Sequence, residues 1–430
     1  MSDLFAARTQ MALSLGFHIV FAEIGIAMPL LMVLAEWRWQ RTGDETYLRL
    51  AKRWARGSAI LFAVGAVSGT VLSFELGLLW PRFMSFAGPI VGMPFSLEGF
   101  AFFTEAIFLG VYLYGRDRIS PRAHLLSGVI VAVSGAASAV FVVTVNAWMN
   151  TPSGLQMNNG RLVGVDPIAG MLNHSTAQQV IHMLIAAYAA TGLAVAGIHA
   201  ALLLRRPDSV FHRRALMLAL AVGAPAAILQ PISGDFSART VAQWQPVKLA
   251  ALEGQFDTRV GAPVRIGGIP DEDARTTRYA IEIPHGLSLL AFHDWDAVVH
   301  GLDDFARDVW PPVAPVHIAF QVMVGLGTTM ALVSLCVGVL VVRRKNLSQY
   351  RWLLVALAIV TPFGFIATEA GWTVTEVGRQ PWVVQGILRT RDAVTPMPGL
   401  IVPMLLFALL YLLLSAIVIA LIRAMVRETI

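Results

Sequence analysis

Long apolar segments separated by short polar connections dominate the chain. Each of nine segments has about 20 or more mostly apolar residues, the length that an α-helix needs to cross the hydrocarbon core of a bilayer. The nine segments are 11–35, 54–79, 95–114, 124–148, 178–204, 214–232, 314–342, 351–376 and 397–424. This pattern predicts an all-α polytopic membrane protein with nine transmembrane helices.

One long hydrophilic interval, residues 233–313, interrupts the pattern between the sixth and seventh apolar segments. It holds 12 of the chain's 27 acidic residues, so we expect it to lie outside the membrane. The chain is therefore divided into helices one to six (1–232), a hydrophilic loop (233–313) and helices seven to nine (314–430).

Lysine and arginine are distributed unequally between the two sets of connections. The short connections that follow the first, third, fifth and seventh segments carry more of these residues than the short connections of the other set. Because cytoplasmic loops are enriched in Lys and Arg, the N-terminus and the interval 233–313 are predicted to lie outside. Nine is odd, so the C-terminus is predicted to lie in the cytoplasm. Residues 1–8 lack the features of a signal peptide, and we expect the first apolar segment to stay in the membrane.

Composition supports a membrane protein and excludes several other classes. The chain is 56% hydrophobic and only 14% charged, whereas soluble domains are roughly 25% charged. Its net charge of +5 comes from short basic clusters between apolar segments, which fits anchored loops and not nucleic-acid binding. Cys336 is the single cysteine, so neither an intrachain disulfide nor covalent haem attachment is expected.

Six glutamates lie within or at the ends of the apolar segments, and no Lys or Arg lies in the middle of any segment. They are Glu23, Glu75, Glu98, Glu105, Glu369 and Glu376. Ionisable residues at membrane depth are costly and commonly functional. Glu98 and Glu105 are seven apart and share one helix face, and Glu369 and Glu376 repeat this spacing. Such pairs are candidates for relaying protons, and carboxylic acids hydrogen-bonded between helices would give the same pattern.

Four residues near the predicted outer side are candidate ligands for haem iron, namely His18, His182, Met323 and Glu376. A His and a Met on facing helices form an axial pair for a low-spin haem, and an open third site suits dioxygen. Taken singly, each residue also fits a structural hydrogen bond or packing. The fifth segment carries His182 and His199, but no second segment offers a matching pair, which argues against the haem anchor of a quinone-linked dehydrogenase.

Six motifs, found in order along essentially the whole chain, resemble subunit I of the cytochrome bd-type quinol oxidases. They are RTQMALSLGFH (8–18), LEGFAFFTE (97–105), NAWMNTPSG (146–154), QPVKLAALE (245–253), MVGLG (323–327) and GWTVTEVGRQPW (371–382). The resemblance implies a terminal oxidase of the bacterial cytoplasmic membrane. Such an enzyme oxidises membrane quinol, reduces dioxygen to water and contributes to a proton gradient without pumping. The resemblance also implies a related subunit II as partner and allows a small single-helix subunit.

The resemblance further implies the haems and their ligands by position in the motifs. His182 and Met323 would be the axial ligands of a low-spin haem b, and Glu376 the ligand of a high-spin haem b. His18 would be the ligand of the dioxygen-binding haem, either haem d or a further haem b. Arg379 lies three residues after Glu376, so it would pair with a haem propionate or with Glu376 itself if the helix continues.

Other site residues follow from the same resemblance. Glu98 and Glu105 match acids of the haem pocket and the proton route. Lys248 and Glu253 match the quinol-oxidising site in the external segment that the family calls the Q loop, here residues 233–313. Trp372 lies one helical turn before Glu376 on the same face.

The chain departs from the family pattern at Gln321, where many members carry an arginine two residues before the methionine ligand. Its Q loop is short, which resembles the branch called cyanide-insensitive oxidases. The alternative function is a proton-coupled secondary transporter whose intramembrane acids carry the coupling proton. Transporters often contain internal repeats, and the sequence shows none.

Overall fold

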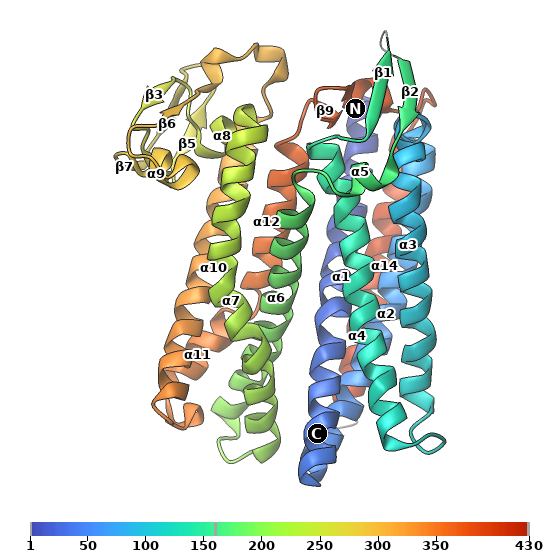
Figure 1. Cartoon of the computed structure of the whole chain (residues 1–430). Coiled ribbons are helices and arrows are strands. Elements are labelled where there is room, and N and C mark those ends of the chain that lie inside the picture. The colour runs from blue at the N-terminus through green and yellow to red at the C-terminus, as the bar shows by residue number, and fades with distance from the viewer. Residues whose placement is uncertain (1, 159–160, 428–430) are drawn as a thin grey trace.

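The computed structural model describes residues 2–158 and 161–427, and most of them form long helices that run side by side (Figure 1). Within these residues nine helical segments are long and apolar enough to cross a membrane, as predicted. They are α1 (Asp3–Thr42), α2 (Glu45–Leu79), α3 (Pro81–Tyr114), α4 (Pro121–Asn150), α6 (Thr176–Arg205), α7 (Val210–Trp244), α10 (Val313–Val342), the pair α11 (Arg351–Ile359) and α12 (Phe363–Val377), and α14 (Ile401–Arg427). The first predicted division begins at residue 1 and the last ends at residue 430, and both of these residues lie outside the described part.

The helices extend beyond the apolar segments because polar residues cap them. Ser2 accepts a hydrogen bond from the Phe5 amide at the start of α1, and Asp44 caps α2 in the same way. Gly43 ends α1 with a φ of 66°, a conformation that glycine adopts without strain, and allows α2 to turn back directly. Helices α1 and α2 are therefore packed antiparallel neighbours.

The eighth predicted helix, 351–376, is in fact two helices. Helix α11 ends at Ile359 and α12 begins at Phe363. Pro362 lacks an amide hydrogen and disfavours helical conformation in the residue before it. The helix therefore breaks immediately before and at this proline. Thr361 packs tightly against Gly197 of α6, where a Cβ atom would collide with it. On the side of Thr361 the break is thus packed against α6.

Small residues bring some helices very close together. A Cβ atom at Gly192 of α6 would lie 2.5 Å from the Cα of Gly223 in α7, so neither position has room for a side chain. Close backbone approach at small residues is a common way in which membrane helices associate. Apolar side chains of α6, α7, α10 and α11 form one core cluster beside this contact.

The Q loop lies at one end of the bundle, the end at which α1 begins (Figure 1). Helix α7 continues to Trp244, past the predicted boundary at residue 232, and the short helix α8 (Pro246–Glu253) follows it. The strands of this end form two-stranded antiparallel sheets. They are β1 (Leu155–Asn158) with β2 (Arg161–Val165), β3 (Arg259–Val260) with β8 (Val298–Val299), β4 (Val264–Ile266) with β7 (Ile281–Ile283), β5 (Ile269–Asp271) with β6 (Thr276–Arg278), and β9 (Trp382–Val384) with β10 (Leu388–Arg389). Short helices α5 (Pro167–Met171), α9 (Gly286–Phe292) and α13 (Thr390–Ala393) complete this end.

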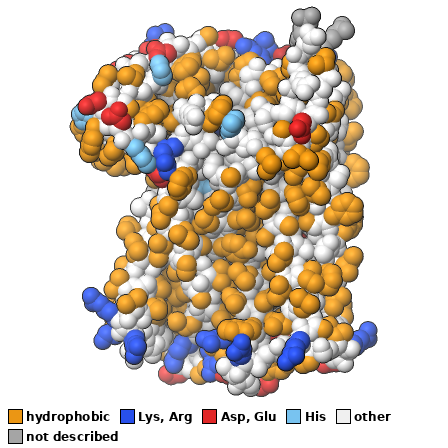
Figure 2. All heavy atoms as spheres, viewed as in Figure 1, with side chains coloured by type: hydrophobic (Ala, Val, Ile, Leu, Met, Phe, Trp, Pro, Cys, Tyr) orange, Lys and Arg blue, Asp and Glu red, His pale blue; other side chains and the backbone are white. Residues whose placement is uncertain are grey.

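Charged and apolar side chains are separated on the surface. Figure 2 shows hydrophobic side chains over the flank of the bundle and Lys and Arg side chains along the end opposite the Q loop. We call this opposite end the basic end. The arrangement is the one expected of a protein that spans a membrane with its basic end in the cytoplasm.

Candidate functional site

Three helices and the turn after α12 meet in one hydrogen-bonded network where the Q loop joins the bundle. Glu376 of α12 accepts hydrogen bonds from Asn146 of α4 and, at 2.6 Å, from Nη2 of Arg379. Asn150 donates to Oδ1 of Asn146 at 3.0 Å, and Lys248 of α8 donates from Nζ to Oδ1 of Asn150 at 2.6 Å. Two asparagines thus connect Lys248 with Glu376, and we call these five residues the Lys248–Glu376 network.

Lys248 is buried, although a lysine in a hydrophilic loop is usually exposed. Its exposed fraction is only 6%, because α8 packs against the bundle. Burial, together with the positive charge of Arg379, lowers the pKa of Lys248 to about 7, while Glu376 opposes the shift. The amine therefore exchanges protons near neutral pH.

Glu253, at the other end of α8, is equally buried but has different neighbours. Five residues along a helix correspond to a rotation of about 140°, so Glu253 and Lys248 point to different sides. The main-chain oxygen of Glu253 accepts from Arg265 at 3.5 Å, and its carboxyl Oε2 has no hydrogen-bond partner among the described residues. Burial raises the pKa of Glu253 to about 7, while Arg265 opposes the shift.

Both predicted histidine ligands are oriented by a serine. Nδ1 of His18 lies 2.9 Å from Oγ of Ser68 in α2, and Nδ1 of His182 lies 2.9 Å from Oγ of Ser233 in α7. This arrangement leaves Nε2 for iron, as is usual for metal-bound histidines. Gln230 lies 3.1 Å from Nε2 of His182, so a ligand there would displace its amide. The sequence interpretation missed both serines, because they lie about 50 residues from their histidines.

The surroundings of the other predicted ligands also fit a haem. Met323 of α10 lies against Gly371 of α12, where a Cβ atom would lie 3.1 Å from its sulfur. Arg379 is 2% exposed, and its Nε and Nη1 have no hydrogen-bond partner within the described chain. A buried guanidinium with two unused donors suits an anionic group such as a propionate. Trp372 is half-buried in α12, one turn before Glu376.

Glu98 and Glu105 share the face of α3 that packs on α4, as their spacing predicts. Ser138 donates to Oε1 of Glu98 at 3.2 Å. Glu105 is buried against Gly135, where a Cβ atom would lie 3.2 Å from its Oε1. The two acids therefore lie in the α3–α4 interface, about two helical turns apart.

Two side chains of α10 form hydrogen bonds with the backbone of the Q loop. Gln321 accepts from the Gly267 amide and donates to the Arg265 carbonyl, each at 2.9 Å. His317 is fully buried, and its ring nitrogens lie 2.7 Å from the Leu252 carbonyl and 3.0 Å from that of Gly267. Gln321, where the family resemblance led us to expect an arginine, therefore binds the loop backbone.

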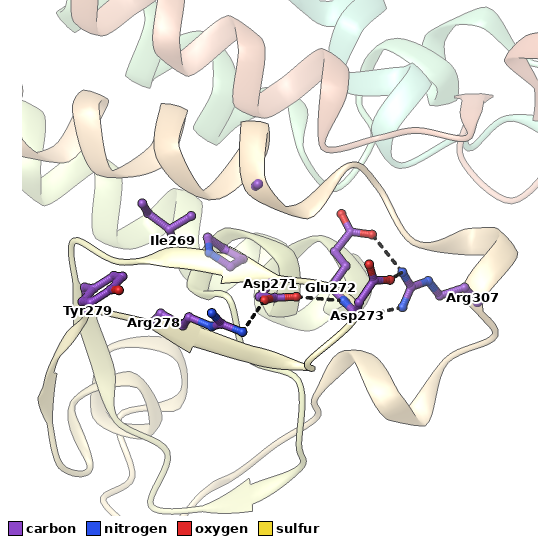
Figure 3. A pocket seen from close by; sticks show the side chains of 9 residues that line it. Ile269, Asp271, Glu272, Asp273, Arg278, Tyr279 and Arg307 are labelled. Carbon is purple, nitrogen blue, oxygen red and sulfur yellow. Dashed lines mark hydrogen bonds and ion pairs between the residues drawn. The ribbon is translucent and has the colours of Figure 1, made fainter.

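A hollow of about 590 Å³ lies elsewhere on the Q loop, beside β5 and β6 (Figure 3). Its charged residues pair with one another: Arg278 with Asp271 at 2.7 Å, and Arg307 with Glu272 at 3.3 Å. Neither Lys248 nor Glu253 lines it. This open hollow, lined by three acids and two arginines, is therefore not the predicted quinol site.

Comparisons with known proteins cover nearly the whole chain. The family model for cytochrome bd terminal oxidase subunit I matches residues 6–430. A Bacillus subtilis (strain 168) protein, provisionally named a cytochrome bd menaquinol oxidase subunit I, is 40% identical over 95% of this chain and 93% of its own length. The cytochrome bd ubiquinol oxidase subunit 1 of the same organism is 32% identical over 92% of this chain and 87% of its own.

A solved structure extends the similarity to the fold. The bd oxidase from Geobacillus thermodenitrificans superposes with a TM-score of 0.93 and 38% sequence identity, over 100% of this chain and 99% of the solved one. The sequence comparisons and the structural superposition therefore indicate the same family over nearly the whole chain. The chain belongs to the cytochrome bd terminal oxidase subunit I family and is a multi-pass membrane subunit of a haem-containing quinol oxidase.

Proposed function

We propose that quinol is oxidised beside α8 and that its electrons pass directly into the haem-bearing part of the bundle. The observation that carries this proposal is the Lys248–Glu376 network, which joins a buried Q-loop amine to a proposed iron ligand through two asparagines. Oxidation of a quinol releases one proton with each electron. The groups that handle the protons must therefore lie beside the groups that accept the electrons.

Within this proposal, α8 supplies the acid–base groups. Glu253 accepts a proton from the quinol hydroxyl, since a carboxyl with a pKa of about 7 is an efficient base at neutral pH. Lys248 donates a hydrogen bond to a quinone oxygen. Burial keeps both groups out of water, which strengthens their interactions with the substrate.

The proposed haem positions follow the ligands already described. His182 and Met323 hold a low-spin haem b, Glu376 holds a high-spin haem b, and His18 holds the dioxygen-binding haem, a haem d or a further haem b. When bound, these groups carry electrons and activate dioxygen. Arg379 offers its unused donors to a propionate, and Trp372 lies on the same helix face. Ser68 and Ser233 keep the histidine rings oriented.

We place the basic end in the cytoplasm and the Q loop outside. Glu105 and Glu98 then lead protons from the cytoplasm to the site of dioxygen reduction, while Glu253 releases quinol protons outside. Together these steps would build a proton gradient without pumping. Subunit II completes the oxidase as the implied partner, and a small single-helix subunit is a further proposed partner.

The ligand assignment is tested by replacing His182 or Met323 with Ala in the assembled oxidase. We expect loss of the low-spin haem b absorbance from the reduced-minus-oxidised spectrum. His199→Ala is the matched control, because this histidine lies in the same helix but bonds His212 of α7. An unchanged low-spin signal in both ligand variants would refute the assignment.

A further inference from the structure

Two carboxyl groups from neighbouring helices lie deep in the membrane. Glu23 lies in α1, at the centre of the apolar segment 11–35, and Glu369 lies in α12. Helices α1 and α12 are in contact, and neither Thr368 nor Glu369 makes a hydrogen bond with the Glu23 carboxyl within the described chain. From α6, Thr191 bonds only the main-chain oxygen of Glu23.

Glu23 is buried, Glu369 is half-buried, and both lack hydrogen-bond partners at the carboxyl among the described residues. Glu23 is 2% exposed, and neither of its carboxyl oxygens nor Oε1 of Glu369 has a hydrogen-bond partner in the described chain. Among the residues described, no Lys, Arg or His forms an ion pair with either group. Two neighbouring carboxylates cannot both stay ionised without a counter-charge. The pair therefore has to hold at least one proton.

The position of the pair relates it to the proposed dioxygen site. His18 lies five residues nearer the Q-loop end of α1, or about 7.5 Å, and Glu376 lies seven residues nearer that end of α12, or about 10 Å. The other oxygen of Glu369 lies beside Gly16, where a Cβ atom would be 3.2 Å away. Glu23 is thus on the basic-end side of both proposed iron ligands, while the Glu369 carboxyl lies at the level of Gly16 of α1.

The helix break lies on the opposite side of the pair. Residues 360–362 separate α11 from α12, about 10 Å further towards the basic end than Glu369. Non-helical backbone at membrane depth occurs only where protein covers it or water reaches it. From the basic end towards the Q loop, the break comes first, Glu369 lies about two helical turns beyond it, and Glu376 lies about two turns beyond Glu369.

We propose that Glu23 and Glu369 form a proton-holding site that supplies the proposed dioxygen site from the basic end, separately from Glu105 and Glu98. Each electron used in reducing dioxygen to water consumes one proton. The pair gives up a proton towards the dioxygen site and takes another from the direction of the helix break. This proposal rests on the ligand roles proposed for His18 and Glu376.

Isosteric variants test the pair in the complete oxidase. We expect Glu23→Gln and Glu369→Gln each to slow quinol-dependent dioxygen consumption by ~10-fold or more with normal haem spectra, because an amide cannot exchange the proton. The double variant should be no slower than the single ones, and Glu23→Asp should restore part of the rate. Glu75→Gln is the matched control, since Glu75 is equally buried but already bonded to Gln10 and Ser14.

Infrared difference spectra between reduced and oxidised enzyme give a readout that does not depend on turnover. A proton held by the pair should give a carboxylic-acid carbonyl band that Glu23→Asp shifts and Glu75→Gln leaves unchanged. Full activity in both Gln variants, or a band that Glu23→Asp does not move, would overturn the proposal. If the Gln variants do not assemble, the comparison of wild type with Glu23→Asp decides. A wrong iron-ligand assignment would show instead in the haem spectra of the His182 and Met323 variants.

Discussion

Lys248 shows how strongly the surroundings of one residue change its chemistry. The amine is surrounded by α8, α4 and the end of α12, and within the described residues its only side-chain acceptor is Asn150. An ordinary loop lysine is a solvated charge, whereas this one is held near its point of half-protonation at neutral pH. A buried amine of this kind can respond to the charge of a bound quinone.

Replacing Lys248 with Met should slow quinol oxidation by roughly 10-fold or more and leave the haem spectrum intact. The change removes the hydrogen bond to the substrate and leaves Oδ1 of Asn150 with one partner fewer, a loss of about 1–3 kcal/mol. The measurement is quinol-dependent dioxygen consumption in the purified oxidase. Lys345→Met, in an exposed turn at the basic end, is the control. Loss of haem in Lys248→Met would instead indicate a structural role.

The rate of quinol oxidation should increase as the pH is raised through about 7. Burial raises the pKa of Glu253 to about 7, so the carboxyl is protonated and unable to accept a proton below that pH, and it becomes a base above it. In Glu253→Gln the rate should be low at every pH and should lose this step. A steady-state pH profile of kcat/KM for quinol measures the effect. A variant that kept the wild-type profile would exclude Glu253 as the base.

At the scale of elements, the apolar pattern predicted the helices well and the site only in part. Nine runs of apolar residues identified nine spans. The break at Pro362 between α11 and α12 was not predicted, because the apolar run continues across it. The helix spacing predicted that Glu98 and Glu105 share a face, which the contacts with α4 agree with. It did not predict the burial of Lys248 or the asparagine link, because these depend on contacts between α4, α8 and α12, which are far apart in sequence.

The attachment of the Q loop to α10 gives a prediction at this scale. Gln321→Leu removes both hydrogen bonds to the loop backbone and leaves a buried amide and carbonyl unpaired, a cost of about 1–3 kcal/mol. We expect faster hydrogen exchange and easier proteolysis in residues 254–312. Val322→Ala, at an exposed neighbouring position, should change neither. Unchanged protection in Gln321→Leu would mean that His317 alone secures the loop.

For the whole molecule, sidedness decides what the oxidase does for the cell. The Lys248–Glu376 network and the Q loop share one end, while the Lys and Arg side chains gather at the other (Figure 2). If quinol protons leave at the Q-loop end and the protons for water enter at the basic end, each turnover moves charge across the membrane. The proposed gradient therefore depends on the orientation of the bundle and not only on its chemistry.

This orientation can be tested with single cysteines in a Cys336→Ser background. Tyr279 is 88% exposed on the Q loop, and Lys345 is exposed at the basic end. In intact cells with a permeable outer layer, a membrane-impermeant thiol reagent should label Tyr279→Cys at once. It should label Lys345→Cys only after the membrane is opened, because the positive-inside rule places that end in the cytoplasm. The reverse pattern would invert the bundle, and Glu253 would then release its protons into the cytoplasm, which would remove the proposed contribution to the gradient.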